Sequence, residues 1–311
     1  MKQSEGKETL EEYLVERVKK SGYPLEIEIS DVLERENFVV FNTQYYFDEE
    51  RKQGRDIDIY ALPLKPDTAD DRIRPLILST DVAIECKKSE THAWVFYTRP
   101  RIPMSSIYIS GQFRTTVPQP EEFTTDSFEW FLQQECLVLH YDKFERIAVA
   151  YEEIKKKKIE KEAGKSGKDG SSRREIFEAV NQLVKFICYE LHRWHDRTTM
   201  LTGTQNLEYM MIFFPIIVFD GDMFEAFLAS GEPVLKSKTH LLLDTHYRCP
   251  YCEEVESFNI DIVHRSYFNE FLRTMKEHFY KTMEAIRRNR DELLKKANED
   301  RMRSHKEATN K

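Results

Sequence analysis

The sequence has no long apolar run. The longest, residues 210–219, spans ten residues and is interrupted by Pro215, whereas a membrane-spanning helix needs about 20 apolar residues. The opening stretch MKQSEGKETLEEY also lacks the apolar segment of a secretory signal. We therefore expect no membrane partner.

Cysteine is scarce, and positive charge is in the minority. The 5 cysteines are an odd number at irregular spacing, which excludes the disulfide framework of a small secreted protein and indicates a reducing, cytoplasmic location. The 47 Lys and Arg residues are outnumbered by 55 Asp and Glu, giving a net charge of -8. This balance excludes a protein that coats nucleic acid by bulk charge, but it does not exclude a nucleic-acid enzyme whose carboxylates hold metal ions. With 40% hydrophobic residues, the chain can build a sizeable core rather than remain disordered.

Periodicity divides the first two thirds of the chain into alternating helices and strands. Expected helices are residues 9–20, 25–36 and 176–193; expected strands are 38–47, 55–62, 76–87 and 209–220. The last of these strands is apolar throughout, as in strands buried on both faces of a sheet. The order predicts an α/β fold with a mixed central β-sheet flanked by helices.

The remaining segments predict an insertion into this core and an extension after it. Proline-rich and polar stretches predict an insertion at about residues 99–170, which includes a basic, glycine-containing loop. After residue 220 we expect strands at 234–247 and 258–264 and a long helix at 267–297. The predicted organisation is therefore a core of residues 1–220 and a C-terminal strand and helix extension, residues 221–311, packed on it.

Two of the apolar strands carry charges that a buried sheet does not favour. In GRDIDIYA, Asp58 lies on the polar face, and in VAIECKK, Glu85 and Lys87 are two residues apart and share one face. If the two strands pair as neighbours, the three side chains converge at one end. Glu26 on the preceding helix could supply a further carboxylate, and we favour it over Glu28.

Carboxylates around one point suit a hard cation such as Mg²⁺, with Mn²⁺ as the substitute. Such an ion activates water and neutralises charge on a phosphoryl group. A lysine beside the carboxylates can position the attacking water, act as a general base or stabilise the transition state. These residue types match metal-assisted hydrolysis of a phosphodiester bond.

The two elements, in this order of helices and strands, resemble the restriction-endonuclease-like, or PD-(D/E)XK, nuclease superfamily. The resemblance covers about residues 24–220 and implies an αβββαβ core. It implies that Asp58, Glu85, the backbone carbonyl of Cys86 and Glu26 hold the metal and that Lys87 is the catalytic lysine. Ile57 stands where the motif has proline. The implied activity is that of a Mg²⁺-dependent endonuclease, with DNA favoured over RNA as the partner. Gln182 stands where relatives carry a supporting polar residue.

Two other functions stay open. The nuclease fold could serve as a nucleic-acid-binding or interaction module without cleavage. Alternatively, Cys249 and Cys252 could bind Zn²⁺ in an interaction protein, with His240, His246 or His264 completing the site, or form a redox pair. A lone C-x-x-C pair is more often a turn, so we do not favour zinc. The apolar stripe of the last helix indicates core packing or a homodimer.

Overall fold

We describe the protein from a computed structural model, which covers residues 9–63, 67–69, 76–101, 113–115, 143–156, 174–202, 208–251 and 255–288. The helices in these ranges are α1 (Leu10–Lys20), α2 (Tyr23–Arg35), α4 (Arg174–Thr202), α5 (Phe268–Arg288) and the short 3₁₀ helix η3 (Arg265–Tyr267). The strands are β1 (Phe38–Asp48), β2 (Gln53–Pro63), β3 (Asp67–Ala69), β4 (Leu76–Lys88), β5 (His92–Pro100), β6 (Phe113–Thr115), β7 (Arg146–Lys155), β8 (Glu208–Asp220), β9 (Met223–Ala229), β10 (Glu232–Ser237), β11 (His240–Arg248) and β12 (Val255–His264).

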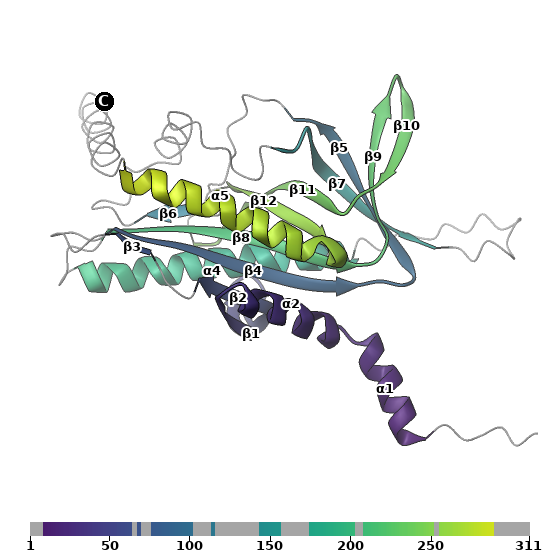
Figure 1. The fold of residues 1–311 in the computed structure, drawn as a ribbon, viewed down its shortest axis with the longest axis horizontal. Helices are drawn as coiled ribbons and strands as arrows, with labels where there is room; N and C mark the ends of the chain where they lie inside the picture. The colour runs from purple at the N-terminus through teal and green to yellow at the C-terminus, as the bar shows by residue number, and fades with distance from the viewer. Residues whose placement is uncertain are drawn as a thin grey trace, which may run out of the picture.

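All of these strands belong to one mixed sheet (Figure 1). Its order is β1-β2-β4-β8-β12-β11-β7-β5-β9-β10, with β3 pairing to β4 and β6 to β8. The first pairs are antiparallel, whereas β4, β8 and β12 run parallel to one another. The predicted α/β class and mixed central sheet are therefore confirmed.

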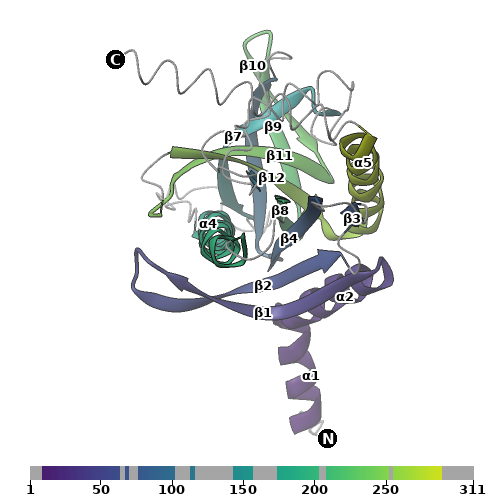
Figure 2. The same ribbon diagram turned by 90° about the vertical axis from the view of Figure 1, so that its left-hand side faces the viewer.

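Helices cover both faces of the sheet (Figure 2). The apolar side of α4 packs on one face, and α2 and α5 pack on the other. In α2 the buried residues Leu25, Ile29 and Leu33 recur every four positions, which places them on one side of the helix. Each buried side chain of this size contributes about 1.5–3 kcal/mol relative to exposure.

Strand β8 shows why its sequence is apolar throughout. Phe213 and Ile217 pack in the α4 core, while Phe214 and Ile216 pack in the core beneath α2 and α5. Side chains of a strand alternate between the two faces, so a central strand between two helical layers needs apolar residues at every position. The prediction of a strand buried on both faces is confirmed.

Several predicted elements differ from those observed. The strand expected at 234–247 is two strands, β10 and β11. Strands β5 and β9 were not predicted, and β7, within the predicted insertion, pairs with β5 and β11 as part of the sheet. Helix α4 extends to Thr202, beyond the predicted end at 193, and the last predicted helix is described only as far as Arg288. Strands β5, β7 and β9 mix polar with apolar residues, so their partners rather than their own periodicity define them.

Strands from both sides of residue 220 belong to the same sheet, because β8 pairs with β12. The residues before and after 220 thus share one sheet within the described ranges. The division of the chain at 220 stays a prediction.

Candidate active site

The candidate site lies where β2 and β4 separate. Their antiparallel ladder runs from Ala61↔Val82 to Ile59↔Ile84 and stops there. Asp58 and Glu85 follow this last pair on the two strands. Beyond it, β4 continues only beside β8, as far as Lys88. The end of the ladder leaves room between the strands for side chains to converge.

Lys87 joins the two carboxylates. Its Nζ lies 2.5 Å from Oε2 of Glu85 and 3.4 Å from Oδ2 of Asp58. The same Asp58 oxygen accepts a hydrogen bond of 2.8 Å from the backbone N–H of Cys86. The structure therefore brings together three of the predicted side chains, Asp58, Glu85 and Lys87.

Glu85 is the most deeply buried member of this cluster. Its side chain is 0% exposed, compared with 24% for Asp58 and 21% for Lys87. Its Oε1 has no hydrogen-bond partner among the described residues. Burial raises the pKa of Glu85 to about 8, although the adjacent Lys87 opposes this shift. A buried carboxylate with a free oxygen is costly to retain unless it has a ligand or a partner.

The charge of Lys87 is held in place by its neighbours. Burial alone would lower the pKa of Lys87, but the Glu85 and Asp58 carboxylates outweigh it and raise the pKa above its usual value. The side chain is thus a protonated ammonium at neutral pH, aimed at the two acids and not at solvent. Arg55, an alternative partner for Asp58, instead lies 3.6 Å from Asp48.

Glu26 approaches the cluster from α2. Burial raises the pKa of Glu26, and the nearby charge of Asp58 raises it further while Lys87 lowers it. No hydrogen bond links Glu26 to the other three side chains in the described part of the chain. Its neighbour Glu28 forms a bidentate ion pair with Arg265, which also reaches Asp220 at 3.2 Å. Of the two glutamates, Glu26 is the one whose charge interacts with Asp58 and Lys87.

The carboxylate oxygens of the site decide whether it can bind a metal ion. The unpartnered Oε1 of Glu85 and the carboxylates of Asp58 and Glu26 offer the hard oxygen ligands that Mg²⁺ prefers. Within the described ranges, however, no cluster of three or more His, Cys, Asp and Glu side chains is spaced to hold a metal. The donor chemistry fits the ion. The role of the Cys86 carbonyl stays a prediction, while the Cys86 thiol is buried, and burial raises its pKa well above the usual value.

Two further residues, Gln182 and Tyr46, lie near the site. Gln182 on α4 donates a 3.4 Å hydrogen bond to the backbone carbonyl of Asp56, two residues before Asp58. Tyr46 on β1 is fully buried, with no described partner for its hydroxyl. Burial and the charge of Glu85 raise the pKa of Tyr46. The alternation of β1 predicts a buried face, but no sequence signal connects Tyr46 to Glu85.

The predicted zinc site lies only partly within the described residues. Cys249 is buried, but Cys252 lies outside the described residues, so zinc binding there stays a prediction. The three histidines considered as its partners contact other groups: His240 lies 2.8 Å from Asp261, His246 3.0 Å from Ser257 and His264 2.7 Å from Ser266.

In α5 the apolar stripe packs in the core through Phe268, Phe271, Leu272 and Met275. A homodimer through this helix stays a prediction. Most of the basic loop, residues 157–173, lies outside the described residues. No helix in the described ranges has the length and apolar character needed to cross a membrane.

Comparisons with known proteins add nothing to this geometry: no family model, curated protein or solved structure matches the chain.

Proposed function

We propose that the protein is a Mg²⁺-dependent nuclease that hydrolyses phosphodiester bonds in DNA, with Mn²⁺ able to replace Mg²⁺. The observation that carries the proposal is the buried, incompletely hydrogen-bonded carboxylate of Glu85 beside Asp58 and Lys87, where two strands separate. Burial of an acid oxygen that has no hydrogen-bond partner among the described residues is unfavourable unless a ligand offsets it. The resemblance to the PD-(D/E)XK nucleases supports the same assignment.

In this proposal Asp58 and Glu85 would hold the metal ion, assisted by the Cys86 carbonyl and Glu26. The bound ion supplies Lewis-acid activation of water and neutralises phosphoryl charge. Lys87 orients the attacking water and donates to the phosphoryl oxygens. Its raised pKa favours this protonated role over that of a general base. Water attacks phosphorus as the bond to the 3′ oxygen breaks; the attacking water gives its proton to bulk solvent, and the leaving 3′ oxygen takes a proton from a solvent water.

The chain offers a closely matched control for the test. Lys88 is the next residue on β4, and its ammonium donates to the backbone carbonyl of Lys19 instead of the carboxylates. Cleavage of single- and double-stranded DNA and RNA should be measured with Mg²⁺, Mn²⁺ and EDTA. We expect Lys87→Ala, Asp58→Ala and Glu85→Gln each to lower the rate by about 100-fold or more, while Lys88→Ala retains it. Equal cleavage by the wild type and all three site variants would overturn the proposal.

A second function is favoured by one specific contact. The Nζ of Lys87 lies 2.5 Å from Oε2 of Glu85, so this contact already engages one oxygen of the acid and the lysine, as expected for a nuclease fold that binds nucleic acid without cutting it. On this alternative the wild type retains DNA on the filter in a filter-binding assay and shows no metal-dependent cleavage. The Asp58→Ala variant then binds DNA as well as the wild type does.

A further inference from the structure

Helix α1 projects from the body of the protein, beyond the end of β4 (Figures 1 and 2). It is nevertheless a defined helix. Thr9 and Glu12 form a reciprocal capping box at its start, and Lys88 of β4 donates a 3.1 Å hydrogen bond to the Lys19 carbonyl at its end. Capping satisfies backbone groups that would otherwise fray. The chain thus holds an ordered helix away from its own core.

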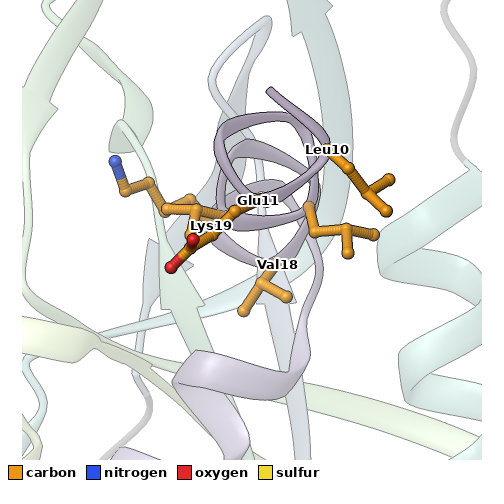
Figure 3. A pocket seen from close by; sticks show the side chains of 6 residues that line it. Leu10, Glu11, Val18 and Lys19 are labelled. Carbon is orange, nitrogen blue, oxygen red and sulfur yellow. The ribbon is translucent and has the colours of Figure 1, made fainter. Parts of the chain in front are cut away.

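One side of α1 is apolar and exposed. Five residues form it: Leu10, Tyr13, Leu14, Val15 and Val18, with exposed fractions of 73%, 51%, 50%, 45% and 58%. Four of these side chains, together with Glu11 and Lys19, line an open, shallow groove along the helix (Figure 3). Isolated apolar side chains on a surface are ordinary, but a contiguous helical face of them marks an interaction site. An 11-residue helix is also marginal in water without a packing partner.

The charges beside the groove indicate which partner fits. Glu11 near the start of α1 and Lys19 near its end line the same groove as Leu14, Val15 and Val18. They are eight positions apart, with Val15 midway. In an antiparallel pair of identical helices, each flank meets the same flank of its partner, with the direction reversed. Glu11 of each copy then lies beside Lys19 of the other.

We propose that α1 is a self-association surface at which two copies of this chain pair antiparallel about Val15. The apolar side chains fill the contact, and two Glu11–Lys19 ion pairs close its ends. In the isolated chain Lys19 pairs with Glu16 of its own helix at 2.9 Å, where both side chains are more than half exposed. Such an exposed pair contributes little, so Lys19 can exchange partners at low cost.

The area that two α1 helices can bury indicates how tightly the two copies associate. A pair of helices this short buries on the order of 800 Å² in total, below the roughly 1,200–2,000 Å² of a stable interface. Tyr23 and Ile27 at the start of α2 are also 67% and 60% exposed and could extend the contact. We therefore expect a weak, reversible dimer.

Charge reversal can identify the orientation. Sedimentation velocity of the full chain, from about 5 to 500 µM, should show a concentration-dependent dimer. Leu14→Glu should abolish it. Glu11→Lys or Lys19→Glu alone places like charges together and should weaken association by about 3- to 10-fold. The double variant Glu11→Lys/Lys19→Glu restores opposite charges and should recover at least part of that loss, although both changes oppose the helix dipole.

Glu16→Gln, which removes the partner of Lys19 in the isolated chain, should leave the dimer no weaker. A cysteine at Val15 should cross-link to itself between copies, whereas one at Leu10 should not, because the two Leu10 residues lie at opposite ends. A wild type that stays monomeric throughout this concentration range overturns the proposal. So does a dimer that survives Leu14→Glu, a double variant weaker than both single reversals, or efficient cross-linking at Leu10.

Discussion

Lys185 on α4 anchors the hairpin whose second strand carries Asp58. Its ammonium lies 3.0 Å from Asp48 at the end of β1 and 2.6 Å from Glu50 in the turn. The side chains of Asp48 and Lys185 are only 1% and 10% exposed. Asp48 also accepts hydrogen bonds from the backbone N–H groups of Glu50 and Arg51, at 3.0 and 3.1 Å. We predict that Lys185→Met destabilises the protein through this buried pair.

The expected magnitude follows from what remains after the substitution. Removing one partner of a buried ion pair costs about 3–5 kcal/mol. Asp48 would keep its two backbone donors, and methionine retains much of the packing of the lysine stem, so we expect a loss of about 2–3 kcal/mol in the free energy of unfolding. The matched control is Lys52→Met on the same turn. Its pair with Glu49 is 74% and 36% exposed, so its loss should stay below about 0.5 kcal/mol.

The effect should also depend on pH in a defined direction. Burial alone would raise the pKa of Asp48, but hydrogen bonds from the Arg51 backbone and from Lys185 outweigh it and hold the pKa below its usual value. A carboxylate with a lowered folded-state pKa stabilises the protein above its unfolded pKa and loses that contribution as pH falls through the folded pKa.

The cost of Lys185→Met, measured by urea unfolding, should therefore shrink between about pH 7 and pH 3. A cost at neutral pH no larger than that of Lys52→Met would refute this reasoning. So would a cost that does not change with pH.

Other predictions concern backbone space and helix docking. Gly221→Ala should lower the free energy of unfolding by about 1–3 kcal/mol, because an added Cβ would lie 2.6 Å from the Phe219 ring and 2.7 Å from a backbone carbonyl. In Gly54→Ala the added Cβ would contact only the end of the exposed Tyr45 ring, which can move aside. Thermal unfolding should therefore show a smaller loss of stability than for Gly221→Ala. Glu36→Gln should weaken the docking of α5 on α2, since Glu36 pairs with Lys276 at 2.6 Å. A side-chain hydrogen bond from Lys276 lowers the pKa of Glu36, so this stability difference should be present at neutral pH and disappear in acid; a difference that persists there would contradict the assignment.

Much of the candidate site could be predicted from local sequence. The alternation around Asp58 and the V-A-I run before Glu85 identify two apolar strands that carry charges, and the two-residue spacing predicts that Glu85 and Lys87 share a face. The structure pairs those strands and joins all three side chains through Lys87. The position of Glu26 relative to them was a weaker prediction, because it depends on how α2 packs on the sheet.

Other contacts had no signal in the sequence. Glu28 pairs with Arg265, 237 residues away along the chain, and not with the site. Lys185 pairs with Asp48, 137 residues away. Ion pairs of this separation follow from the order of strands and not from any periodicity. The same is true of β5, β7 and β9, whose partly polar sequences become strands through pairing with one another.

Hydrophobic period and residue chemistry are local properties, so they specify the helices and strands of the core, their order, and the residue types at the candidate site. Long-range contacts are needed to bury Glu85 with one oxygen unpartnered among the described residues, to place Lys87 between two carboxylates, and to leave the apolar side of α1 exposed. Burial and pairing depend on which distant segments meet. The free energy of those long-range contacts, and not local propensity, selects the arrangement.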